Sequence, residues 1–141
     1  MANGIKSSER VKAFGEVFTP DEIVNDMLDL IDEQYKGLTA DEYISMIYLE
    51  PACGDGHFLI RLLFRKLEKV KGLSVDQRSL AMVRALSSIY GIDIQADNVD
   101  TARKRMKALL LGRKLTIFNC GSGKKRNKAE AKEKRQRASR P

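Results

Sequence analysis

Cysteine, histidine and proline are scarce in this chain, and their scarcity excludes several classes of protein. The 141 residues include two cysteines, one histidine and three prolines. Cys53 and Cys120 do not form a CxxC pair, so neither a disulfide framework nor a paired-thiolate metal site is expected. The single histidine, His57, leaves no basis for a histidine metal site. Free thiols suit a reducing compartment, so we expect a cytoplasmic protein without a metal.

Long apolar runs are also missing. No stretch is long enough to span a bilayer, and the first sixteen residues, MANGIKSSERVKAFGE, are polar and charged where a secretory leader would be apolar. The length corresponds to one domain. The sequence therefore predicts a single domain that neither crosses nor enters a membrane.

The positive charge is concentrated at one end of the chain. Of 26 Lys and Arg and 19 Asp and Glu, nine basic and two acidic residues lie from Lys124 onwards, which leaves 17 of each sign in residues 1–123. Residues 121–141 begin with Gly-Ser-Gly and show no apolar periodicity, so we expect a disordered basic tail that attracts nucleic-acid phosphates without reading sequence. The domain proper is then residues 1–120.

Apolar periodicity predicts alternating helices and strands. Helices are expected over residues 20–33, 58–71, 79–86 and 97–111, with a short helix or turn at 39–42. Strands are expected over 45–50, 88–94 and 114–119. Thr19 is the expected N-cap of the first helix, with Pro20 at its first position, and Asp97 the expected cap of the last. Alternation of this kind favours an α/β fold with a parallel sheet, whose ligand lies beyond the carboxyl ends of the strands.

A glycine turn follows the first expected strand, in the stretch YLEPACGDGHFL. Gly54 and Gly56 allow a sharp turn that brings backbone N–H groups close to a ligand. Position 59 is Leu, so the GxGxxG pattern of dinucleotide-binding proteins is absent. Glu50 at the strand end would repel a pyrophosphate but would suit an ammonium group. These residues predict a nucleoside ligand that carries an ammonium group and no diphosphate.

Three segments resemble motifs of S-adenosylmethionine-dependent DNA adenine-N6 methyltransferases of restriction–modification systems. LEPACGDGHFL looks like their motif I, FGEVFTPDEIV resembles motif X, and YGIDI resembles motif II. The segments occur in the family's order and cover roughly residues 11–111. The resemblance implies a partial Rossmann-like methyltransferase fold, with three parallel strands, flanking helices and an N-terminal motif X helix.

The resemblance also implies roles for individual residues around S-adenosylmethionine. Phe18, Thr19 and Pro20 would close over its methionine part. Glu50 would orient the ammonium group, and Asp93 would accept hydrogen bonds from the ribose hydroxyls. Ile94 would pack against the adenine face. The backbone turn beside the cofactor would consist of Ala52, Cys53, Gly54 and Gly56, with Asp55 between the two glycines.

Simpler roles remain open for several of these residues. Thr19 and Pro20 are equally explained as a helix cap, and Asp55 as a turn residue. Cys53 is better explained as a small packed side chain than as a nucleophile. His57 is expected to be structural or solvent-facing. Asp76 is an alternative ribose acceptor, but Asp93 is preferred because a strand precedes it.

The catalytic motif of the family is missing from this sequence. No Asn/Asp-Pro-Pro-Tyr/Phe segment occurs, since the prolines are Pro20, Pro51 and Pro141. In the family this motif holds the flipped adenine, so no catalytic residue is assigned here. The far edge of the strand at 45–50 would also be unpaired and apolar. We expect the cofactor-binding part of a truncated or split enzyme, inactive alone and completed by a second chain.

Two other functions remain open. A non-catalytic nucleic-acid-binding protein would use the half-fold as a platform and the basic tail for affinity. A methyltransferase for RNA or protein would share motif I, although the Phe-Thr-Pro element favours DNA as the partner.

Overall fold

The structure, a computed structural model, describes residues 7–119, with side chains for residues 7–113. The predicted basic tail, residues 121–141, lies outside the described residues. The elements in chain order are α1 (Ser8–Phe14), α2 (Asp21–Gln34), α3 (Ala40–Ser45), β1 (Tyr48–Glu50), α4 (His57–Val70), α5 (Val75–Ser87), β2 (Ile89–Gly91) and α6 (Ala96–Asn119).

Local capping signals explain where several helices begin and end. Thr39 forms the predicted capping box with Glu42 at the start of α3. The start of α5 lies earlier than predicted, where Gln77 accepts from the Ser74 N–H. Helix α1 was not predicted; Ser7 caps its start, and Gly15, in the left-handed region, caps its end.

Two predicted caps are wrong. Helix α2 begins at Asp21 with Pro20 as its N-cap, and no side chain makes a capping hydrogen bond there. Pro20 is extended, with ψ at 151°, so Thr19 lies one residue too early to reach the first free N–H groups. Helix α6 begins at Ala96, which places Asp97 inside the first turn.

The sheet has two parallel strands among the described residues, with Tyr48 opposite Ile89 and Glu50 opposite Gly91. Both strands lie inside the ranges predicted from sequence, but the third strand, predicted over 114–119, is wrong because α6 runs through this segment. Thr, Ile and Phe favour strands only beside a partner strand, and no proline stops the helix. The fold is α/β and mostly helical, and its Rossmann-like character stays a prediction.

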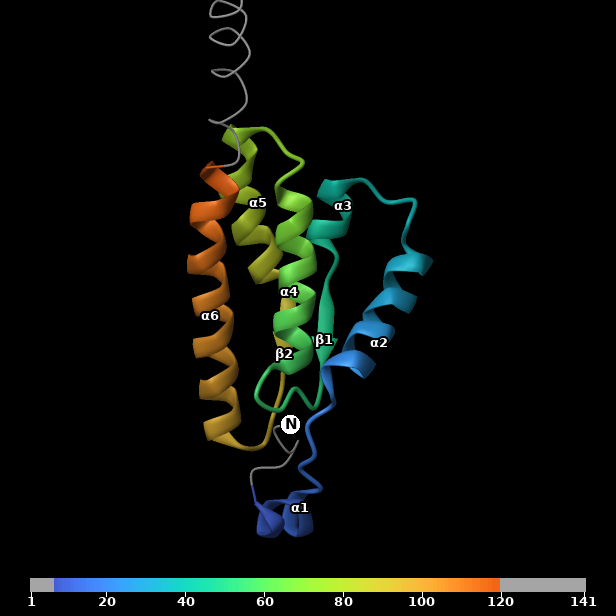
Figure 1. Ribbon diagram of the computed structural model, residues 1–141, viewed down its shortest axis with the longest axis vertical. Helices are drawn as coiled ribbons and strands as arrows, with labels where there is room; N and C mark the ends of the chain where they lie inside the picture. Colours follow the sequence, from blue (N-terminus) through green and yellow to red (C-terminus); the bar gives the residue numbers. More distant parts are fainter. Residues whose placement is uncertain (1–6, 120–141) are drawn as a thin grey trace, which may run out of the picture.

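Helix α4 lies at the centre of the molecule (Figure 1), and its apolar residues join two clusters of buried side chains. Leu63 and Leu67 pack with α3 and α5, whereas Leu62 packs with Val24 and Leu28 of α2. Burying each leucine contributes roughly 1.5–3 kcal/mol relative to exposure. The cores on both sides of α4 therefore fix α2 and α5 relative to the sheet.

One charged residue of α4 is fully buried. The Lys66 ammonium donates to the carbonyl oxygens of Ile44 and Met46 and to Ser88 Oγ. It thus satisfies carbonyls at the end of α3 and a hydroxyl just before β2. Burial without a paired carboxylate lowers the pKa of Lys66 to about 8.

One face of the sheet is uncovered within the described residues. Leu49 and Tyr90 are paired across the strands and are exposed, and Ile47 and Ile92, two residues away, are exposed too. Residues two apart on a strand share a face, so these four form an apolar patch opposite the side covered by α4. None of the helices in residues 7–119 is long and apolar enough to cross a membrane.

Candidate functional site: an acidic pocket at the strand ends

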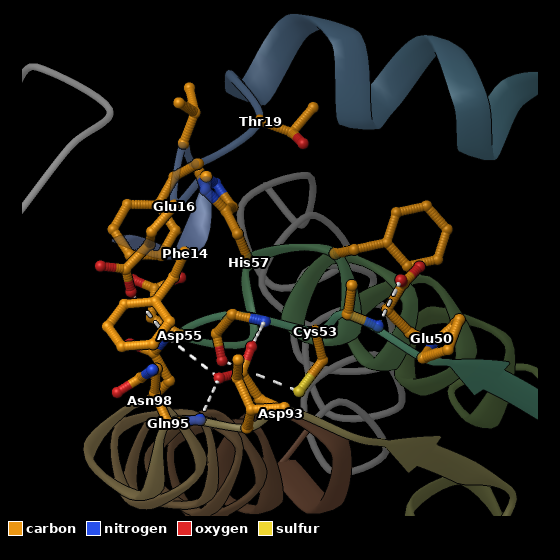
Figure 2. A pocket seen from close by; sticks show the side chains of 18 of the residues that line it. Phe14, Glu16, Thr19, Glu50, Cys53, Asp55, His57, Asp93, Gln95 and Asn98 are labelled. Carbon is orange, nitrogen blue, oxygen red and sulfur yellow. Dashed lines mark hydrogen bonds between the residues drawn. The ribbon is translucent and has the colours of Figure 1, made fainter. Parts of the chain in front are cut away.

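A pocket of about 520 Å³ lies where β1 and β2 end. Nine of the eleven residues expected to contact a cofactor line it, from three separate segments of the chain. They are Phe18, Thr19, Glu50, Ala52, Cys53, Gly54, Asp55, Asp93 and Ile94. Figure 2 shows Thr19 on the segment leading into α2, across the cavity from Glu50 and Asp93 on the neighbouring strand ends. Pro20 and Gly56 are not among the lining residues.

The two glycines of the turn have different roles. Both have positive φ, 53° at Gly54 and 85° at Gly56, which side chains rarely adopt. A Cβ at Gly56 would lie 2.6 Å from the Cβ of Ala102, so this position lets the turn pack against α6. A Cβ at Gly54 would instead lie 3.2 Å from the Phe18 ring. Gly54 therefore faces the pocket, and Gly56 faces the protein.

Asp93 joins the ends of the two strands. Its Oδ2 accepts from the Gly54 N–H at 2.9 Å, and its Oδ1 accepts from the Gln95 N–H at 2.8 Å and from Asn98 at 3.2 Å. The side chain that follows β2 therefore holds the turn that follows β1. Asp76, the alternative acid, lies in the first turn of α5 and is not a lining residue.

A polar network that the sequence did not reveal closes one side of the pocket. Buried Asn98 donates to Asp93 and, at 2.7 Å, to Glu16 Oε1. Arg10 of α1 binds both oxygens of Glu16 and also pairs with Asp97 at 3.0 Å. These contacts place residues 14–19 against the pocket. Ser7 and Gly15 are residue types that commonly cap helices, so they gave a local signal for α1 itself.

The charged lining is acidic. Glu16, Glu50, Asp55 and Asp93 line the pocket, and its lining includes no Lys or Arg among the described residues. Arg10 and Arg105 neutralise Glu16 and Asp55 through ion pairs. Among the described residues, the Glu50 side chain accepts one hydrogen bond, from the Ala52 N–H at 3.2 Å. A cationic group is therefore the favoured occupant near Glu50 and Asp93.

Asp55 is held through one of its two carboxylate oxygens. Its Oδ2 accepts from Arg105 at 2.6 Å, but its Oδ1 is buried and has no hydrogen-bond partner among the described residues. Leaving a buried acceptor unsatisfied costs about 1–3 kcal/mol. This oxygen is shielded from solvent and the carboxylate already pairs with Arg105 of α6, so the contacts of Asp55 hold the turn and do not by themselves favour a ligand contact.

Aromatic and aliphatic side chains form the remaining walls. Phe14, Phe18 and Phe58 line the cavity, and the exposed Ile94 lies at its edge. Such side chains suit the flat face of a nucleobase. The pocket therefore combines a cation-favouring end with apolar surfaces.

His57 also lines the pocket, and its contacts are structural, one of the two roles expected for it. Its Nε2 lies 2.5 Å from Asp21 Oδ1, and Arg61 contacts the same carboxylate. Hydrogen bonds from Arg61 and then from His57 lower the pKa of Asp21. The group joins the first turns of α2 and α4, so His57 has a structural role at the pocket wall.

Cys53 is a packed side chain, as preferred from the sequence. It is buried, and burial followed by the charge of Asp93 raises the pKa of its thiol. A raised pKa keeps the thiol protonated, which is the opposite of what a nucleophile needs. Its N–H donates to the Ile92 carbonyl at 2.9 Å and so continues the pairing of the two strands.

No model of a protein family, no curated protein and no solved structure matches this chain.

Proposed function

We propose that this chain is the S-adenosylmethionine-binding part of a DNA adenine-N6 methyltransferase of a restriction–modification system. The observation that carries the proposal is that one acidic pocket gathers nine residues from segments resembling motifs X, I and II. Those segments are separated by tens of residues in the sequence, yet Phe18, Gly54 and Asp93 face one cavity.

The chemistry of the lining fits this cofactor. S-Adenosylmethionine carries an ammonium and a sulfonium group but no phosphate, and it would supply an electrophilic methyl group when bound. Glu50 is the acceptor proposed for the ammonium. Asp93 is proposed to accept from the ribose hydroxyls. Phe18 and Ile94 are proposed to contact apolar parts, and the acidic charge disfavours nucleotides with diphosphates.

Methyl transfer is proposed to need polypeptide beyond these residues. The Asn/Asp-Pro-Pro-Tyr/Phe motif does not occur in the sequence. The two-stranded sheet, with its exposed Leu49 and Tyr90, offers a surface that further strands and helices could cover. We propose that a second chain supplies the catalytic motif and that DNA binds the completed enzyme.

Calorimetry on the purified chain tests the cofactor proposal. S-Adenosylmethionine should bind weakly, whereas ATP and NAD should not bind measurably. Glu50→Gln and Asp93→Asn should each weaken binding about tenfold or more, as expected for lost charge-assisted contacts. Asp76→Asn removes a carboxylate from α5 and is the matched control, with unchanged affinity expected. Equal affinity for ATP and S-adenosylmethionine would contradict the proposal.

The uneven charge supports a second function, non-specific nucleic-acid binding by residues 124–140, which contain nine Lys and Arg. Nine cations would give steeply salt-dependent affinity without sequence preference. Removing residues 124–141 should abolish retention of duplex DNA at low salt and leave cofactor binding unchanged. Unchanged retention would exclude this role.

A further inference from the structure

Helix α2 carries an exposed apolar stripe beside its buried face. Ile23, Met27 and Leu30 are spaced four and three residues apart and are 50%, 46% and 74% exposed. Val24 and Leu28 of the same helix are buried against α4. The stripe is therefore the uncovered half of an apolar arc, and such spacing is typical of a helix face that contacts a second helix.

Acidic side chains border this stripe. Helix α2 contains Asp21, Glu22, Asp26, Asp29, Asp32 and Glu33 and no Lys or Arg. Asp21, Asp29 and Asp32 pair with Arg61 and Arg65 on the side of the helix that faces α4. Glu22 and Asp26 make no ion pair with any residue that the structure describes. On a helix of 3.6 residues per turn these two acids lie along the solvent side of the stripe.

The charge of this border distinguishes among the possible occupants. A second copy of the chain would bring acidic border against acidic border, which is repulsive. Nucleic acid and anionic lipid would be repelled in the same way. Residues 121–141 have the right charge, but their only aliphatic side chains are alanines, which are too small to cover Ile, Met and Leu.

We propose that the α2 stripe is the docking site for an amphipathic helix of another protein, with an apolar ridge flanked by Lys or Arg. The ridge would cover Ile23, Met27 and Leu30, and the basic residues would face Glu22 and Asp26. This interaction is independent of the identity of the pocket's ligand. Since Met27 also lines the pocket, the docked helix would border the cavity.

Fluorescence anisotropy with two synthetic peptides tests the proposal. One peptide of about 18 residues, or five helical turns, has a leucine ridge flanked by lysines, and its twin has glutamates in place of the lysines. The full-length chain should bind the lysine peptide at least about tenfold more tightly, and added salt should reduce the difference because charges steer the choice. Failure of the lysine peptide to bind, or equal binding of the two, would overturn the proposal.

Surface variants locate the binding. The double change Ile23→Ser with Leu30→Ser should abolish binding, and Glu22→Lys with Asp26→Lys should reverse the preference toward the glutamate peptide. Leu80→Ser with Val83→Ser removes exposed apolar residues of α5 and is the matched control, which should bind normally. If the control lost peptide binding to the same extent, the binding would be non-specific hydrophobic association, and the proposal would be overturned. Two further results would also overturn the proposal. One is dimerisation of the chain, seen by sedimentation, and the other is binding of the chain to anionic vesicles, in either case abolished by the double change Ile23→Ser with Leu30→Ser.

Discussion

The carboxylate of Asp93 accepts a hydrogen bond from the backbone N–H of Gly54 at 2.9 Å, across 39 residues of sequence. One side chain at the end of β2 therefore fixes the turn at the end of β1. The same turn faces Phe18 and the pocket, so the acid that the resemblance assigns to a ligand also orders the protein around it.

Replacing Asp93 should show how much its hydrogen bond to Gly54 stabilises the folded chain. Asp93→Ala leaves the Gly54 N–H without its acceptor, and we expect a loss of about 1–3 kcal/mol in the free energy of unfolding. Asp93→Asn keeps one carbonyl oxygen and should lose less. Urea titration of both variants measures the difference. Equal stability of Asp93→Ala and the original chain would mean that the bond does not hold the turn.

Gly56→Ala should be more damaging than Gly15→Ala, although both glycines have a positive φ. It combines a positive φ with a Cβ 2.6 Å from the Cβ of Ala102, so we expect a loss of more than about 1–3 kcal/mol. Gly15→Ala is the matched control, because its φ is also positive but its Cβ would meet nothing within 4 Å. The Ala102→Gly change should rescue part of the Gly56→Ala loss in a double-mutant cycle. Equal losses at Gly15 and Gly56 would exclude the packing explanation.

Lys66 should make the stability of the chain rise with pH between about 8 and 9, below the range in which the raised thiol pKa of Cys53 acts in the opposite direction. In the folded chain the Lys66 ammonium releases its proton at about pH 8, well below the ordinary value of 10.5, because it is buried. Between these two values the unfolded chain binds more protons, so raising the pH favours the folded state. Denaturant titrations from pH 7.5 to 9 measure this slope. Lys66→Met should flatten it, and Lys69→Met, on the same helix, should leave it unchanged; a flat profile in the original chain would contradict the prediction.

Arg10→Gln should loosen the wall formed by residues 14–19. It removes the ion pairs from Arg10 to Glu16 and Asp97, and α1 has no buried residue to replace them. Faster hydrogen exchange is therefore expected at the amides of residues 8–18, together with weaker ligand binding. Lys12→Gln, in the same helix, is the control and should exchange like the original chain. Unchanged exchange in Arg10→Gln would show that other contacts hold this wall.

The uncovered sheet face should make the isolated chain prone to self-association. Leu49→Lys with Tyr90→Lys places two charges on this apolar patch and should reduce aggregation as concentration rises. Light scattering measures the effect, and circular dichroism checks that the fold is retained. Aggregation of the variant at the rate of the original chain would mean that another surface is responsible for self-association.

Patterns that act locally were predictable from the sequence. The Thr39 capping box and the apolar stripe of α4 lie within single segments, and both are present as expected. The glycine turn and Asp93 were placed at one site because parallel strands end at the same edge. The strand over residues 114–119 failed because its formation depends on a neighbouring strand rather than on its own residues.

Contacts between distant polar residues were not predictable in this way. Asn98 lies 82 residues from Glu16, and neither position carries a local signal of pairing. Thr19 was misplaced as a cap because the extended conformation of Pro20 delays the helix by one residue. Both failures concern the segment before α2, in which none of residues 14–20 is buried in the core.

Helix α1 contributes no side chain to the hydrophobic core and is tied to the remaining protein through Arg10. Trimming the first fourteen residues, whether by a protease or by the choice of a start codon, would consequently leave the core intact but release residues 15–19 from the side of the cavity. Preparations of this chain should therefore be checked by intact mass before any negative binding result is interpreted.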